Sequence, residues 1–139
     1  MLVLDTDHLT ALGYDSPLGQ RLLARLDQAG QDVVTTVINV DEQLSGLFAA
    51  VHSRHLPEDQ ILPYAELIER VEFLAGFLIL PWDMESSGRF HQMKAAKIRA
   101  GTMDLKIACI ALVHDATLLT RNAVDFAKVP GLRFESWLD

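Results

Sequence analysis

The sequence has almost no cysteine and no long apolar run, and these absences exclude several classes of protein. Its single cysteine, Cys109, excludes an intramolecular disulfide, and its apolar neighbours indicate a small buried residue rather than a reactive thiol. The longest apolar stretch, from Phe73 to Pro81, is interrupted by Gly76 and is far shorter than the roughly 20 residues of a membrane span. The first residues, Met1 to Leu4, lack the basic leader and the cleavage site of a signal peptide. We therefore expect a soluble, cytoplasmic protein.

Basic residues are also few. The sequence has 12 lysines and arginines and 19 aspartates and glutamates, which gives a net charge of −7. This balance argues against a protein that binds nucleic acid through its overall positive charge. The distribution is uneven, however, and residues 81–139 hold eight basic and seven acidic side chains. Arg89, Lys94, Lys97 and Arg99 follow one another closely. They form either a stripe for phosphate groups or a solvated helix face.

The sequence has no Pro-, Gly- or Ser-rich tract, and 22% of its residues are charged. We therefore expect neither a linker nor a disordered segment. Half of the 139 residues are hydrophobic, which is enough to bury a sizeable core. Residues 1–139 are predicted to form one domain around that core.

Short apolar runs alternate along the chain with segments of helical spacing. The runs have no polar alternation, as expected of strands that are buried on both faces of a parallel sheet. The predicted strands cover residues 2–4, 33–38, 77–80 and 116–119, with a last one near 132–134. The predicted helices cover residues 18–26, 40–51, 61–74, 85–99 and 105–113. This order predicts an α/β fold, a three-layer sandwich with helices on both faces of a mainly parallel sheet.

Acidic and amide side chains follow three of the predicted strands, at the sheet edge where ligands bind in such folds. Asp5 comes directly after the first strand. Asn39 follows the second strand, and Glu42 is predicted in the first turn of the next helix. Asn122 and Asp125 follow the fourth strand. These side chains are therefore expected to gather at one edge of the sheet.

Asp104 differs because it stands at the start of a predicted helix, after Gly101. A helix N-terminus beside the same edge would bring this carboxylate to the others. Lys106 is the nearest charge that compensates it along the chain. Asp5 directly follows a buried strand, so its carboxylate must be hydrogen-bonded, paired or bound to a cation.

Helix capping is the structural alternative for most of these residues. Asn39 with Glu42, and Asn122 with Asp125, have the spacing of an N-cap and the third helical residue. Asp7 and Asp104 suit a cap or a first turn near the helix dipole. Taken singly, these residues are explained by capping. Taken together, several carboxylates at one edge repel one another, and a divalent cation that neutralises them explains the arrangement better.

The chemistry of these ligands indicates which cation and which reaction to expect. Oxygen ligands favour Mg²⁺ or Mn²⁺ over zinc. Such ions retain water, and they activate it for attack on a phosphodiester. Metal-assisted phosphodiester hydrolysis is therefore the predicted reaction.

Four segments of the chain resemble the PIN-domain ribonucleases, and within them the VapC-like toxins of bacterial toxin–antitoxin pairs. The resemblance covers nearly the whole length and is strongest in the last forty residues or so. It is carried by Leu4-Asp5-Thr6-Asp7, by residues 36–46, by residues 101–108, and by residues 120–126 with Val129-Pro130-Gly131-Leu132 after them.

The resemblance implies roles for the residues at the predicted edge. Asp5, Glu42 and Asp104 would be the central acids and metal ligands, with Asn122 or Asp125 at a fourth catalytic position. Thr6 and Thr120 would be supporting hydroxyls. It also implies Mg²⁺- or Mn²⁺-dependent endonucleolytic cleavage of RNA, a homodimer, and inhibition by a cognate antitoxin.

Two residues depart from the family pattern, and two other functions compete. Asp7 stands where the family often has asparagine, and Asn122 stands where some members have aspartate, so the number of metal ions is open. A PIN-like binding module that has lost cleavage is one alternative. A haloacid-dehalogenase-type phosphatase is the other, because Asp5-Thr6-Asp7 after a strand is similar to its nucleophile motif. That superfamily would have threonine or valine where this chain has Leu9.

Overall fold

A computed structural model describes residues 1–139 and contains a five-stranded sheet in the order β3-β2-β1-β4-β5. All neighbouring strands are parallel, and in the centre of the sheet Val3 pairs with Val34 on one side and Leu118 on the other. The strands are β1 (Leu2–Leu4), β2 (Val33–Thr36), β3 (Leu78–Leu80), β4 (Thr117–Leu119) and β5 (Arg133–Glu135). The parallel sheet confirms the fold class predicted from the apolar runs.

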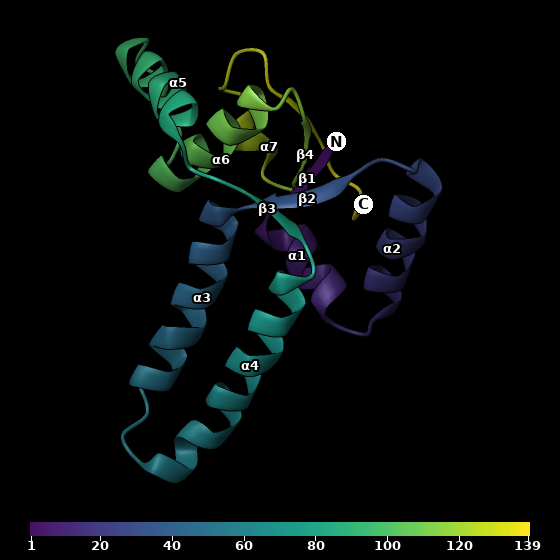
Figure 1. Ribbon diagram of the computed structural model, residues 1–139, viewed down its shortest axis with the longest axis vertical. Helices are drawn as coiled ribbons and strands as arrows, with labels where there is room; N and C mark the ends of the chain where they lie inside the picture. Colours follow the sequence, from purple (N-terminus) through teal and green to yellow (C-terminus); the bar gives the residue numbers. More distant parts are fainter.

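Helices connect the strands and cover both faces of the sheet (Figure 1). They are α1 (Thr6–Gly13), α2 (Pro17–Ala29), α3 (Val37–His52), α4 (Ile61–Ala75), α5 (Met84–Ala95), α6 (Thr102–Val113) and α7 (Ala123–Phe126), with a 3₁₀ turn, η1 (Pro57–Gln60), before α4. None of these helices has the length and apolar character needed to cross a bilayer.

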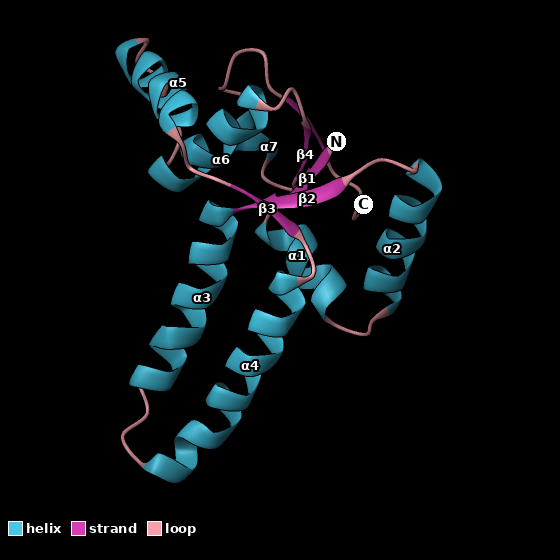
Figure 2. Ribbon diagram, in the orientation of Figure 1, coloured by secondary structure: helices cyan, strands magenta, loops and turns pink.

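The strands bury apolar side chains on both faces, which makes the molecule three layers thick (Figure 2). Leu2 and Leu4 of β1 pack with Leu9 of α1 and Leu22 of α2. Val3 belongs to the other cluster, together with α6 and α7. This alternation is expected for a central strand, because successive side chains point to opposite faces. The predicted three-layer sandwich is confirmed.

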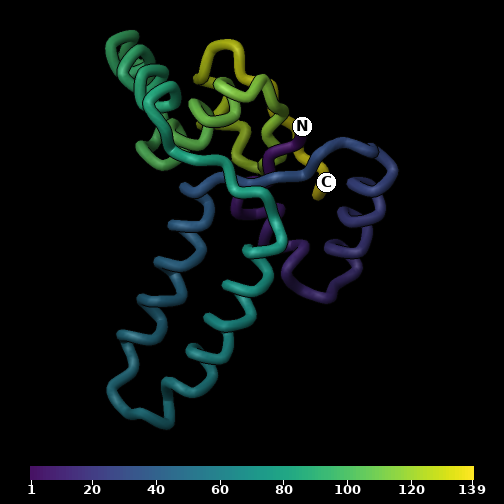
Figure 3. The backbone as a smooth tube through the Cα atoms, in the orientation of Figure 1, coloured from purple at the N-terminus to yellow at the C-terminus, as the bar shows by residue number.

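Helices α3 and α4 pack against each other and extend away from the sheet as a long hairpin (Figure 3). The part of α3 nearest the sheet lies close to α1 and α6. Only the first turns of α3 therefore contribute to the sheet edge, where the predicted acids lie.

Two predicted boundaries are wrong for identifiable reasons. The strand predicted over 33–38 ends at Thr36, because the Thr36 side chain accepts a hydrogen bond from the Asn39 amide and begins α3. Ile38 is therefore helical. The helix predicted over 85–99 ends at Ala95, since Lys97 adopts a left-handed conformation with φ of 60°. Helices α1 and α7 were not predicted.

Candidate active site

Asp5 is the most buried acid of the molecule and is held from two neighbouring elements. It follows β1, and its side chain is 6% exposed. Asn39 Nδ2 donates to Asp5 Oδ1 at 2.8 Å, and Thr120 Oγ1 donates to Asp5 Oδ2 at 2.7 Å. Burial raises the pKa of Asp5 above its ordinary value, although the hydrogen bonds from Thr120 and Asn39 oppose the rise. Asp5 is thus fixed in place by neutral donors, and no basic side chain forms a salt bridge with it.

Glu42 lies on the second turn of α3, one turn later than predicted, and faces the same edge. Thr6 Oγ1 donates to Glu42 Oε2 at 2.9 Å, and Asn39 Nδ2 lies 3.2 Å from Thr6 Oγ1. Burial raises the pKa of Glu42, and the negative charges of Asp5 and Asp104 raise it further. These acids therefore lie close enough to repel one another.

Asp104 lies in the first turn of α6, as predicted, and has the most strongly shifted carboxyl group. Burial raises the pKa of Asp104 from 3.8 to about 6, and the charges of Asp5 and Asp125 contribute. Asn122 Nδ2 donates to Asp104 Oδ2 at 3.1 Å. The molecule's salt bridges include none of Asp5, Glu42 or Asp104. The site therefore carries negative charge that no basic side chain pairs with.

Asn122 and Asp125 have different positions at this edge. Asn122 caps α7 by accepting a hydrogen bond from the Asp125 amide at 3.4 Å, which confirms the predicted capping spacing. Its Nδ2 also lies 3.1 Å from Asp125 Oδ2. Asp125 forms a salt bridge with Lys128 at 3.3 Å. Hydrogen bonds from Asn122 and Lys128 lower the pKa of Asp125. Asn122 is the inner residue of the pair, and Asp125 is the outer one.

The capping interpretation of Asn39 and Glu42 is wrong, because Thr36 is the N-cap of α3. Asn39 Oδ1 accepts from Thr36 Oγ1 at 2.7 Å, which leaves Nδ2 directed at Asp5. Asn39 is fully buried. It was predicted to lie at this edge, but not to be a catalytic residue or a metal ligand. The signal that would have found it is a threonine at the end of an apolar run followed by asparagine three residues later.

Asp7 is held by protein donors, although its negative charge contributes to the raised pKa of Asp5. Its Oδ1 lies 2.5 Å from His8 Nδ1, and its Oδ2 accepts the Arg121 backbone N–H at 2.8 Å. Although burial acts to raise it, the pKa of Asp7 is lowered by these hydrogen bonds. Asp7 is therefore occupied by its protein partners.

A divalent cation fits the chemistry of this site. Asp5, Glu42 and Asp104 offer only oxygen atoms, and their mutual repulsion is unrelieved. No three His, Cys, Asp or Glu side chains converge closely enough here to hold one ion together. Mg²⁺ needs only one or two protein carboxylates and keeps several waters. The residues therefore fit a hydrated ion better than a closed protein cage.

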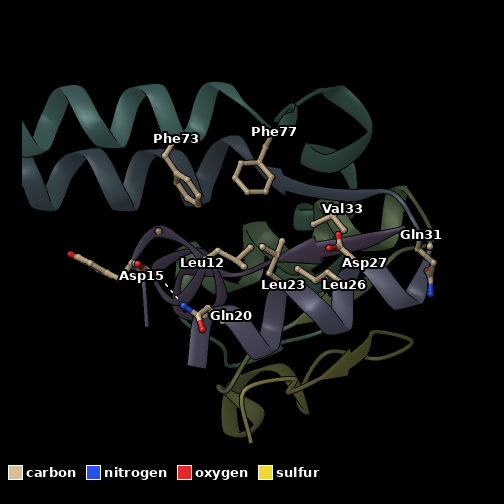
Figure 4. A pocket seen from close by; sticks show the side chains of 14 residues that line it. Leu12, Asp15, Gln20, Leu23, Leu26, Asp27, Gln31, Val33, Phe73 and Phe77 are labelled. Atoms are coloured by element: carbon tan, nitrogen blue, oxygen red, sulfur yellow. Dashed lines mark hydrogen bonds between the residues drawn. The ribbon is translucent and has the colours of Figure 1, made fainter. Parts of the chain in front are cut away.

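The largest cavity of the molecule is separate from the acids. It has a volume of about 680 Å³, and Phe73 and Phe77 of the α4 end face Leu12, Leu23 and Leu26 of α1 and α2 across it (Figure 4). None of the predicted site residues lines it. Half of its lining residues are hydrophobic, and the cavity does not belong to the acidic site.

The sequence and the fold have counterparts among known proteins. A family model described as "PIN domain" matches residues 2–132. The chain belongs to the PIN-domain family. Nucleases of this kind in the VapC group generally depend on a divalent metal.

Individual relatives agree with this family. Ribonuclease VapC1 of Rickettsia felis is 28% identical over 135 residues, which cover 94% of this chain and 92% of the relative. DNA-bound VapBC from Salmonella typhimurium matches with a TM-score of 0.77 and 21% identity, over 98% of this chain and 97% of that one. A toxin–antitoxin complex from Klebsiella pneumoniae matches with a TM-score of 0.68 and 20% identity, over 95% of both chains. These structures share the fold of this PIN-domain chain.

Proposed function

We propose that this chain is a metal-dependent endoribonuclease that cleaves RNA phosphodiester bonds and serves as the toxin of a toxin–antitoxin pair. The supporting observation is the cluster of Asp5, Glu42 and Asp104, which has no basic side chain in a salt bridge with it. The likeness to ribonuclease VapC1 and to the toxin–antitoxin complexes supports the same activity. Residues 1–139 would act as one nuclease unit, in the cytoplasm and as a homodimer.

Asp5, Glu42 and Asp104 would hold a hydrated Mg²⁺ or Mn²⁺ ion, partly through its waters, and the ion when bound would supply an activated water and stabilise charge on the phosphate. The neighbouring side chains orient these acids. Asn39 and Thr120 fix both oxygens of Asp5. Ionised carboxylates are required for metal binding, so the site should be most competent above the pKa of about 6 of Asp104.

The other two acids are also oriented by hydrogen bonds from neighbouring side chains. Thr6 fixes Glu42 at 2.9 Å, and Asn122 fixes Asp104 at 3.1 Å. Asn122 and Asp125 complete the catalytic set at its outer side. Asp7 has both oxygens engaged by protein donors, so it is not proposed as a metal ligand.

An RNA cleavage assay tests this proposal. The protein should cleave a fluorescent RNA with Mg²⁺ or Mn²⁺ and stop in a chelator, because the ligands are all oxygens. Asp5→Asn and Asp104→Asn should abolish cleavage and remove the stabilisation that Mg²⁺ gives to the folded state. Asp59→Asn, an exposed residue of η1, is the matched control and should change neither. Cleavage at the wild-type rate by Asp5→Asn and Asp104→Asn would exclude this site.

A further inference from the structure

The turn between α5 and α6 concentrates positive charge in a chain whose net charge is −7. No acidic residue lies between Glu85 and Asp104. Lys94, Lys97 and Arg99, here named the basic turn, are all exposed, and none forms a salt bridge. By contrast, Arg121, Lys128 and Arg133 are paired with carboxylates. The basic turn therefore holds cations that no acidic side chain neutralises.

The backbone of the basic turn places a lysine where glycine is favoured. The Ile98 amide donates to the Met93 carbonyl at 3.1 Å, and the Lys97 amide donates to the Lys94 carbonyl at 3.0 Å. This pair of bonds is a Schellman motif, whose left-handed position is usually glycine. Lys97 occupies that position with φ of 60°. A side chain with a Cβ is strained there, so the lysine side chain is kept at a cost in stability.

The basic turn leads directly into the acidic site. Lys128 Nζ donates to the Arg99 carbonyl at 3.2 Å and to Asp125 Oδ1 at 3.3 Å. At the end of the turn, a Cβ built on Gly101 would lie 3.7 Å from Asp104 Oδ2. The backbone of the basic turn at Arg99 therefore lies next to Asp125, at the outer side of the acidic site.

We propose that the basic turn binds the phosphate groups of the RNA chain beside the scissile bond, with Lys97 as its central contact. The inference rests on the proposed nuclease function and names the surface that holds its substrate. Phosphates are repelled by Asp5, Glu42 and Asp104, so the substrate needs cations outside the cluster. Lys97 and Arg99 lie on the chain segment that runs up to Asp104 and supply them. Phosphate contacts of this kind position a nucleic acid without reading its sequence.

Lys97→Gly is the sharpest test, because it should weaken RNA binding without lowering the melting temperature. Removing the side chain relieves the left-handed backbone, so the melting temperature should stay the same or rise. Removing the cation should weaken RNA binding. Binding of a fluorescent, unstructured single-stranded RNA is measured by anisotropy in an Asp5→Asn background between 50 and 300 mM KCl. The slope of log K against log salt should become shallower by roughly 0.7 for Lys97→Gly and by about 1.4 with Arg99→Ala added.

Arg54→Ala is the matched control, because Arg54 is exposed and unpaired beyond the far end of α3. It should leave the slope unchanged. In the cleaving protein, Lys97→Gly should raise KM and leave kcat nearly unchanged. A slope equal to that of Arg54→Ala, or a melting temperature lowered by Lys97→Gly, would overturn the proposal, because the cations would then serve only the C-terminus of α5.

Two further outcomes distinguish RNA binding by the basic turn from an antitoxin contact and from the proposed nuclease function. If Lys97→Gly weakens binding of an antitoxin but leaves the RNA slope unchanged, the basic turn is a protein contact and the proposal fails. If the slope changes as expected while the wild-type protein cleaves no RNA with Mg²⁺, the basic turn is supported and the proposed nuclease function fails.

Discussion

Asn122 donates a hydrogen bond from Nδ2 to Oδ2 of Asp104 at 3.1 Å, and the same nitrogen lies 3.1 Å from Asp125 Oδ2. One amide group therefore bridges two carboxylates, whose charges still act on each other. Without that amide, the side chains of Asp104 and Asp125 would face each other or solvent. The residue at position 122 therefore determines the net charge around Asp104 and Asp125.

Asn122→Asp should make the site more dependent on metal. Aspartate caps a helix about as well as asparagine, so α7 keeps its cap. The variant loses the donor to Asp104 and Asp125 and adds a third negative charge, which destabilises the metal-free protein. We expect a lower melting temperature without metal and a larger rise on adding Mg²⁺ than in the wild type. Asn122→Ser, which caps without charge, is the control; an unchanged Mg²⁺-induced rise in Asn122→Asp would contradict the prediction.

The pKa of about 6 of Asp104 predicts that the metal-free protein gains stability on acidification. The folded state holds the Asp104 proton more tightly than the unfolded state, so stability falls as pH rises from about 4 to about 6. The loss is about 1–2 kcal/mol after allowance for solvent screening. Urea unfolding in chelator should show this loss in the wild type and not in Asp104→Asn. A wild-type stability that rises over that interval by the same amount as in Asp104→Asn would contradict it.

Much of the fold was predictable because its signals are local. The strands Leu2–Leu4 and Thr117–Leu119 are short apolar runs between helical segments, and their carboxyl ends define the edge where Asp5 and Asn122 lie. The end of β2 was not predictable from hydrophobicity, because Val37 and Ile38 continue the apolar run into α3. The Thr36 hydroxyl makes the difference, and its capping bond depends on three-dimensional geometry.

The hydrogen bonds around Asp5 depend on contacts between distant parts of the chain. Asn39 and Thr120 meet at Asp5 across separations of 34 and 115 residues. The resemblance had implied the Thr120 hydroxyl. The spacing of Thr36 and Asn39 indicates a helix cap, but it does not indicate that Asn39 turns toward Asp5. Helix α1 is only eight residues long and buries the polar His8 beside Leu9. The contacts of His8 with Asp7 and Trp137 are not visible in a hydrophobic pattern, so the helix was missed.

An antitoxin that covers the acidic edge should compete with metal. Asp5, Glu42 and Asp104 lack a basic partner, and an arginine guanidinium presents a planar fork that suits carboxylates. We expect the purified complex with its antitoxin to show a weakened Mg²⁺ affinity and no cleavage. Mg²⁺ binding is measured by calorimetry for the free chain and for the complex. An antitoxin complex with unchanged Mg²⁺ affinity and unchanged cleavage would contradict this prediction.

Asp7 should be more important for stability than a surface acid, because two donors converge on it. The Trp137 backbone N–H donates to His8 Nε2 at 3.1 Å, so the hydrogen of His8 is on Nδ1 and is donated to Asp7 Oδ1. The Arg121 amide donates to Asp7 Oδ2 at 2.8 Å. Asparagine has one acceptor oxygen and one NH₂ group. In Asp7→Asn one of the two donors must therefore face another donor.

Asp7→Asn should lower the free energy of unfolding at pH 7 by about 1–3 kcal/mol, the usual cost of an unpaired buried polar group. The lowered pKa of Asp7 fixes the sign of the pH dependence. Its contribution is present above the unfolded pKa and is lost as pH falls through the folded one. The difference between wild type and Asp7→Asn should therefore be largest at pH 7 and shrink below about pH 4. Urea unfolding at both pH values measures it, with Asp59→Asn as the exposed control. Equal stability of Asp7→Asn and wild type at pH 7 would show that Asp7 does not tie His8 and Arg121 together.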